Sequence, residues 1–219
     1  MQIVSEGIEA YLETLHPIDA RLAAVQEEGA TLRLPIIDTT VGRFLESTIL
    51  STGARQVLEI GTANGYSALW MARSLPSDGH LLSIEIDAAR AAMARQHFTD
   101  AGLDQRVHVI VGDAARMVHK VAGPFDVIFN DGDKTQYGLL LDRLVALLRP
   151  RGVLITDNVL WDGEVVPGLV ASPHHPPEET EAIAAYNRRV VTDPRLVTSF
   201  LPVRDGLAVS VKRPTAPDS

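Results

Sequence analysis

Short apolar runs alternate with helix-like stretches over the central part of the chain. Five runs read as strands: Gln56–Ile60, His80–Ile86, Arg106–Val111, Phe125–Asp131 and Gly152–Asp157. Runs that are apolar at nearly every position suit parallel strands with both faces buried, and helices of about a dozen residues between them indicate βαβ units. This alternation predicts an α/β fold, a doubly wound sheet with helices on both faces.

The helical stretches and the C-terminal end complete this prediction. Helices are expected over Ser67–Leu75, Ala88–Ala101, Ala114–Val121, Thr135–Leu148 and Pro177–Val191. Two further strand-like runs, Arg195–Pro202 and Leu207–Lys212, are joined by only four residues. Because so short a link cannot hold a crossover helix, these runs should pair antiparallel. We therefore predict a Rossmann-like, seven-stranded, mostly parallel sheet closed by an antiparallel hairpin.

The N-terminal region is predicted to cover this sheet. Residues 3–29 have helical periodicity interrupted at Pro17, Leu32–Asp38 should be extended, and Thr39 or Thr40 should cap a helix that ends near Leu50. The 219 residues suit one domain. We divide it into a helical cover (1–50), a cofactor-binding core (51–213) and a disordered tail (214–219).

Composition excludes several classes of protein. The chain has no cysteine, so disulfides, thiolate chemistry and Cys-ligated zinc are excluded. It begins without the pattern of a secretory signal and contains no apolar run of the roughly 20 residues that span a bilayer. A formal net charge of −8 disfavours polyanionic partners, whereas an acidic cleft suits a divalent cation. We predict a cytoplasmic protein with no membrane partner.

The loop within Gln56–Ser67 indicates a cofactor site. A strand-like run leads into glycines at Gly61 and Gly65, and a helical pattern begins near Tyr66. Glycines allow a ligand to approach the backbone closely. Their spacing is G-x-x-x-G rather than the G-x-G-x-x-G of dinucleotide sites, and no P-loop lysine follows. The loop therefore predicts a nucleoside cofactor rather than a pyrophosphate.

Each of the five predicted parallel strands has an acidic residue at or just beyond its carboxyl end. Ligands of open α/β sheets bind outside these ends. Any one of these acids could be a solvated or helix-capping residue, and Asp113 could simply cap a helix beginning at Ala114, but five in succession indicate a site. Glu85 lies where an acid commonly binds ribose hydroxyls. The acids are Glu59, Glu85, Asp113, Asp131 and Asp157.

Asp131, Asp157 and Asn158 form a distinct group. Carboxylate and amide oxygens are hard ligands that suit Mg²⁺ or a similar cation, and the two strands that carry them should be neighbours. Lys134 could act as a general base if nearby cationic charge and partial desolvation lower its pKa. The alternative is a surface lysine at the start of a helix, where the positive end of the helix dipole disfavours a cation.

The irregular segment Trp161–Pro177 separates the last parallel strand from the next helix. Its prolines and lack of periodicity predict a mobile lid or a dimer-contact loop. It contains the adjacent residues His174 and His175. We expect both to be exposed to solvent rather than to bind a metal, since they follow one another on an irregular loop.

These motifs resemble those of a known family. VLEIGTANGYSALWMA, SIEID, GDA, DGDK with Tyr137, DNVLWDGEVV and DGLAVS are similar to the cation-dependent class I S-adenosylmethionine (SAM) O-methyltransferases, which include catechol and caffeoyl-CoA O-methyltransferases and bacterial relatives. The resemblance extends over residues 32–213. Two positions depart from the family pattern: Gly132, where Ala is usual, and Asn130, where an apolar residue is usual.

The resemblance implies a role for each motif residue. Glu59, Gly61, Thr62 and Ser67 would surround the methionine part of SAM, Glu85 would bind the ribose, Asp113 and Ala114 would border the adenine, and Asp133 would lie near the amine. Asp131, Asp157 and Asn158 would bind Mg²⁺, or another divalent cation such as Mn²⁺ or Ca²⁺. Lys134 would be the catalytic base, and Asp131 and Asp205 would lie near the substrate. Ile37 matches a cofactor-contacting position weakly.

Substrate and assembly are left open by the motifs. A small catechol-like vicinal diol is preferred, and the alternative is 5-hydroxyuridine at the tRNA wobble position. Against tRNA stands the absence of a dense basic cluster, with Arg188–Arg189 and the pair Arg149 and Arg151 as the best candidates. A non-catalytic nucleotide-binding module and a nicotinamide-dependent dehydrogenase are further alternatives, the second disfavoured by the glycine spacing. The resemblance also implies a homodimer.

Overall fold

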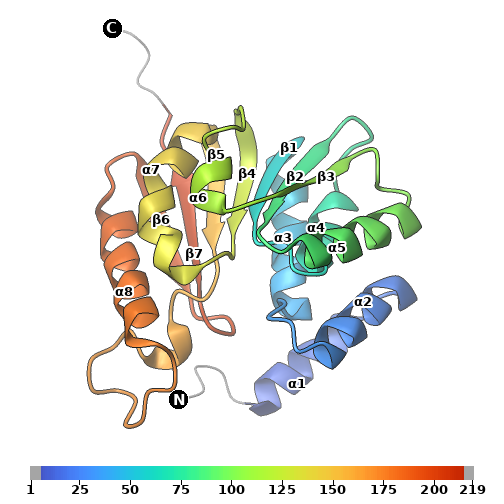
Figure 1. The fold of residues 1–219 in the computed structure, drawn as a ribbon. Helices are drawn as coiled ribbons and strands as arrows, with labels where there is room; N and C mark the ends of the chain where they lie inside the picture. Colours follow the sequence, from blue (N-terminus) through green and yellow to red (C-terminus); the bar gives the residue numbers. More distant parts are fainter. Residues whose placement is uncertain (1–5, 215–219) are drawn as a thin grey trace, which may run out of the picture.

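A seven-stranded sheet runs through the centre of the structure, a computed structural model that describes residues 6–214 (Figure 1). The predictions for residues 3–5 and for the tail beyond Pro214 lie outside this range. Across the sheet the strand order is β3-β2-β1-β4-β5-β7-β6. The strands are β1 (Gln56–Ile60), β2 (His80–Glu85), β3 (Val107–Val111), β4 (Phe125–Asn130), β5 (Leu148–Thr156), β6 (Leu196–Leu201) and β7 (Leu207–Lys212).

The strand directions confirm the predicted topology. β1 pairs in parallel with β2 and β4, β2 with β3, and β4 with β5. β7 pairs antiparallel with both β5 and β6, so it enters the sheet between them and runs against all the other strands. The short link between β6 and β7 forces this reversal. Strand order reverses between β1 and β4, where open α/β sheets bind ligands.

Successive residues of the central strands are buried on opposite faces. In β4, Val127 and Phe129 join the core beneath α2 to α5, whereas Ile128 joins the core beneath α6 to α8. The predicted helices on both faces are therefore confirmed, as Figure 1 also shows. The helices are α1 (Glu6–Leu15), α2 (Ala20–Thr31), α3 (Thr39–Thr52), α4 (Tyr66–Ala72), α5 (Ala88–Asp100), α6 (Ala114–Met117), α7 (Tyr137–Leu147) and α8 (Pro177–Thr192).

The N-terminal helices form the predicted cover, with one correction. The break at Pro17 separates α1 from α2 as expected, but neither Thr39 nor Thr40 caps α3. Asp38 does, because its carboxylate accepts a hydrogen bond from the Val41 amide at 2.8 Å. None of the helices in the described range is long and apolar enough to cross a bilayer.

Two other boundaries differ from the prediction by four residues. α6 ends at Met117 instead of Val121, because the Arg143 guanidinium donates to the carbonyls of Val118 and Val121 and so replaces helical bonds. β5 begins at Leu148 rather than Gly152, and its pairing with β4 shifts register between Phe125 and Val127.

Candidate active site

A cavity of about 620 Å³ opens at the carboxyl ends of the parallel strands. It lies where the topology places ligands, and its size suits a small-molecule site. Eleven predicted site residues line it: Gly61, Thr62, Ser67, Glu85, Asp113, Ala114, Asp131, Asp133, Lys134, Asn158 and Asp205. Glu59 and Asp157 are fully buried and lie behind the lining.

Gly61 brings the ends of β1 and β4 together. Its φ is +92°, and a Cβ at this position would lie 2.4 Å from the carbonyl oxygen of Asp131. The Asp131 amide donates to the Ile60 carbonyl at 2.9 Å. Glycine is therefore required both by the left-handed backbone and by the contact between the two strand ends.

Glu85 supports the glycine loop in addition to lining the pocket. Its carboxylate accepts hydrogen bonds from the backbone amides of Thr62 at 3.1 Å and Ala63 at 2.9 Å. Its second oxygen accepts from the Asp87 amide at 3.0 Å. These bonds hold the loop beside the carboxylate, which lines the pocket.

Glu59 acts as a buried support rather than as part of the pocket surface. Its two oxygens accept hydrogen bonds from the Ser67 hydroxyl at 2.6 Å and the Ser83 hydroxyl at 2.5 Å. Burial raises the pKa of Glu59 to about 8, despite these two bonds. Through Ser67 the side chain positions the first turn of α4, which does line the pocket.

Two acids on the pocket wall also cap helical segments. Asp113 accepts from the Ala115 amide at the start of α6 and from the Gln136 side-chain amide at 3.0 Å. Asp133 accepts from the amide and hydroxyl of Thr135 at the start of the short 3₁₀ helix Lys134–Gln136. The capping role considered for Asp113 is therefore present, and it coexists with a place in the pocket lining.

Lys134 forms an ion pair inside the pocket. Its Nζ donates to Asp131 Oδ1 at 2.8 Å, and both side chains are largely covered. Burial lowers the pKa of Lys134, but the Asp131 carboxylate and the Tyr137 hydroxyl outweigh it, so the net shift is upward. The condition set for Lys134 as a general base, a lowered pKa, is therefore not met while Asp131 alone faces its ammonium group.

Asp157 supplies a buried oxygen with no hydrogen-bond partner. Its Oδ1 accepts from the Asn158 amide at 2.7 Å, whereas Oδ2 has no partner. Burial and the Asp131 charge raise the pKa of Asp157 to about 7. Asn130 and Thr156 face each other in the β4–β5 register, so Asp131 and Asp157 follow at adjacent strand ends. Two carboxylates, one of them with an unpartnered buried oxygen, fit a divalent cation.

The hairpin turn after β6 closes the site. Asp205 accepts from the Asn158 side-chain amide at 3.3 Å and from the Asp162 backbone amide. The side-chain nitrogen of Asn158 is thereby engaged, and its carbonyl oxygen is the atom of this side chain that could bind a cation. Burial raises the pKa of Asp205, although the Asp162 amide opposes this shift.

Several lining residues were not predicted as site residues. Trp161 is 7% exposed, its φ is +50°, and the Lys134 ammonium lies 5.9 Å from its ring centroid. Its place directly after the DNVL motif was the only signal in the sequence. The others include Arg90, Gln136, His175, Glu179 and the segment 35–37, of which only Ile37 had been named.

The two departures from the family pattern lie at the end of β4. A Cβ on Gly132 would meet the Ile60 side chain at 2.9 Å, so an alanine there requires a small shift of Ile60. Asn130 is fully buried, and both polar atoms of its amide lack a hydrogen-bond partner. Neither residue displaces Asp131, which lines the pocket.

Comparison with known proteins agrees with this geometry. The profile of the O-methyltransferase family matches residues 12–213. The chain belongs to this O-methyltransferase family. It is 36% identical over 171 residues to a catechol O-methyltransferase of Niastella koreensis, covering 74% of this chain and 77% of the relative. It is 34% identical to a catechol O-methyltransferase of Mycobacterium tuberculosis, covering 81% and 79% of the two chains.

Solved structures of O-methyltransferases share the fold. The enzyme from Bacillus cereus, solved in complex with SAH, superposes with a TM-score of 0.84 at 30% identity, covering 94% of this chain and 97% of that one. TomG from Streptomyces achromogenes, solved in complex with SAM, gives a TM-score of 0.84 at 26% identity, covering 94% and 96%. The predicted family and fold are thus confirmed for this O-methyltransferase.

Proposed function

We propose that this O-methyltransferase transfers the methyl group of SAM to one hydroxyl of a small catechol-like aromatic diol, with the help of Mg²⁺ or a similar divalent cation. The observation that carries the proposal is the unpartnered oxygen of Asp157, buried beside the Asp131–Lys134 pair at one end of the pocket. The glycine loop and Glu85 form the other end.

SAM fits the part of the pocket bounded by β1 to β3. The homologous structures that hold SAM or SAH support this cofactor. Glu85 presents a carboxylate to the ribose hydroxyls, and Asp113 and Ala114 border the adenine. When bound, the cofactor would supply a sulfonium methyl group for transfer to the substrate oxygen, with the electron pair of the carbon–sulfur bond left on sulfur.

Asp131, Asp157 and Asn158 would hold the cation, whose positive charge favours the ionised form of a substrate hydroxyl. Lys134 receives the hydroxyl proton. It can do so only where its bond to Asp131 is weakened, since that bond raises its pKa. Asp205 and Trp161 bound the space left for an aromatic ring, and holding both reactants there supplies much of the rate.

The tRNA alternative is less well supported. Two of the four basic candidates are engaged elsewhere: Arg189 pairs with Asp142 at 2.5 Å, and Arg149 forms an ion pair with Asp126. Neither arginine lines the pocket. Affinity for tRNA comes largely from free Lys and Arg side chains that contact phosphates and release counterions. An arginine that is already paired with a carboxylate contributes less to this affinity.

The substrate class is tested by a methyl-transfer assay that compares a panel of catechols with bulk hypomodified tRNA. We expect turnover of catechols that requires an added divalent cation and stops in excess EDTA. If tRNA is methylated and no catechol is, tRNA would replace the catechol as the assigned substrate. Full turnover in excess EDTA, by protein shown to contain no metal, would refute the cation.

Asp157→Asn tests the carboxylate that carries the proposal. We expect methyl transfer to fall by about 100-fold or more, as when one electrostatic group is removed from an active site. The melting temperature should be unchanged or higher, because a buried carboxylate next to Asp131 is replaced by a neutral amide. Asp104→Asn, at an exposed position, is the matched control. Equal activity of both variants would contradict the proposal.

A further inference from the structure

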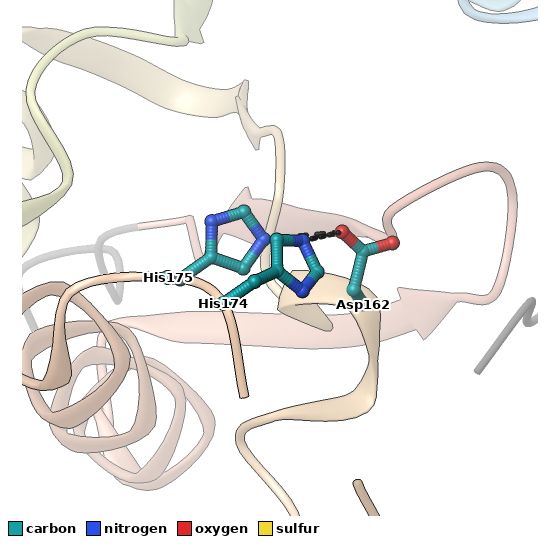
Figure 2. Close-up of side chains that lie close together, drawn as sticks. All are labelled: Asp162, His174 and His175. Carbon is teal, nitrogen blue, oxygen red and sulfur yellow. Dashed lines mark hydrogen bonds and ion pairs between the residues drawn. The ribbon is translucent and has the colours of Figure 1, made fainter. Parts of the chain in front are cut away.

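Three side chains outside the proposed Mg²⁺ site converge beside the pocket. They are Asp162, in the turn after β5, and His174 and His175, from the segment that precedes α8 (Figure 2). One potential ligand atom from each lies within 4.8 Å of the other two. The expectation that both histidines face solvent is wrong for His175, whose ring stacks on Trp161 with centroids 4.0 Å apart and whose side chain is 22% exposed.

We propose that Asp162, His174 and His175 bind one Zn²⁺ ion or a similar transition-metal ion. Imidazole nitrogens and a carboxylate are ligands that such ions take, whereas Mg²⁺ favours oxygen ligands. The site is therefore distinct in chemistry from Asp131, Asp157 and Asn158. It does not depend on the proposed methyl transfer.

The two distances from Asp162 to the histidines are close to those between ligands of one tetrahedral ion, and the third pair lies within 4.8 Å. Asp162 Oδ2 lies 3.1 Å from His175 Nε2 and 3.3 Å from His174 Nε2. Two ligands bonded to zinc at about 2.0 to 2.1 Å with a tetrahedral angle are about 3.3 to 3.4 Å apart. Three protein ligands leave one position for water or a substrate group, and the partial exposure of His174 and Asp162 leaves that position accessible.

Glu164 orients the histidines from behind. Its carboxylate, whose side chain is 1% exposed, lies 3.1 Å from His174 Nδ1 and accepts from the backbone amides of His174 at 2.7 Å and His175 at 3.3 Å. Because a carboxylate only accepts, the proton of a neutral His174 belongs on Nδ1. The lone pair of Nε2 then points toward Asp162, as in the carboxylate–histidine–metal arrangement.

The three proposed ligands lie next to residues that line the pocket. Trp161 and His175 both line the pocket, and Asp162 donates its backbone amide to Asp205. A bound ion would therefore fasten the segment containing His174 and His175 to the turn at 161–164, at the end of the pocket opposite the glycine loop.

The test is a calorimetric titration of full-length protein with ZnCl₂ after chelator treatment, in millimolar Mg²⁺. All titrations use protein that also carries Asp157→Asn, which removes the competing site of oxygen ligands; this is the background protein. We expect one ion per chain. The double variant His174→Gln with His175→Gln should bind about 100-fold more weakly or not at all. The matched control is His80→Gln with His108→Gln, which alters two neighbouring rings 6.4 Å apart that are not part of the cluster.

Glu164→Gln sharpens the test, since loss of a partner behind a metal-binding histidine weakens affinity by roughly 10- to 100-fold. Hydrogen exchange of residues 165–173 should slow when Zn²⁺ is added to the background protein and not when it is added to the His174/His175 double variant. The proposal is overturned by absence of Zn²⁺ binding, by equal binding in the His174/His175 double variant, or by equal loss in the His80/His108 control.

Discussion

The carboxylates at the two ends of the pocket are partnered differently. Near the carboxyl ends of β1 and β2, Glu59 and Glu85 each accept at least two hydrogen bonds from neighbouring hydroxyls or backbone amides. Beyond β4 and β5, Asp131 faces Lys134, and one oxygen of Asp157 has no partner. The first end is complete without a ligand, so it provides a rigid cradle. The second end has buried negative charge that a cation would compensate.

The largest effect that tests this difference between the two ends is expected at Lys134. Lys134→Met should lower kcat by about 100-fold or more, because the proton acceptor is lost, while the affinity for SAM measured by calorimetry stays unchanged. Lys134→Arg keeps the positive charge beside Asp131 but cannot accept a proton, so it should not restore kcat. Wild-type kcat in the arginine variant would show that Lys134 acts only through its charge.

An intermediate effect is expected at Gly61, at the rigid end. Gly61→Ala carries a left-handed backbone cost of about 1 to 2 kcal/mol in stability. Its Cβ also clashes with Asp131 and should shift the loop that lines the pocket, so SAM should bind at least about 10-fold more weakly. Gly53→Ala is the matched control, since Gly53 has φ +60° and open space around its Cβ position. Both variants should melt at lower temperature, but only Gly61→Ala should weaken SAM binding. Equal binding by the two variants would contradict the close approach of β1 and β4.

A third effect, on stability rather than on kcat or SAM binding, concerns the buried support Glu59. Its pKa in the folded protein, about 8, lies above the ordinary value of 4.5. As pH rises, the unfolded chain loses the Glu59 proton before the folded protein does. The contribution of this group to stability is therefore fully present below about pH 4.5 and is lost as pH rises toward 8. The free energy of unfolding should fall by up to about 1.4 kcal/mol per pH unit over this range. Glu59→Gln should flatten the melting-temperature profile over this range. Identical profiles would place a charged Glu59 in the core.

Much of the architecture could be predicted from local pattern. β1 has the predicted bounds, Gln56–Ile60, because an apolar run and a glycine turn leave little freedom there. The acids at five strand ends meet at one edge, since parallel strands place their carboxyl ends together. Less regular segments were predicted less well: α6 stops at Met117, and Arg143, 25 residues from Val118 in the chain, binds the Val118 carbonyl just beyond its end.

What the sequence determined by itself is the order of strands and helices, the family and the set of carboxylates at the pocket edge, because periodicity and motif spacing are local properties. Only the tertiary structure decided the partner of each charged group. Lys134 has a raised pKa because Asp131 faces it, Glu59 supports Ser67 from behind the lining, and Asp162 meets His174 across a loop. Burial and distance set these properties, and neither is encoded at a single position of the chain.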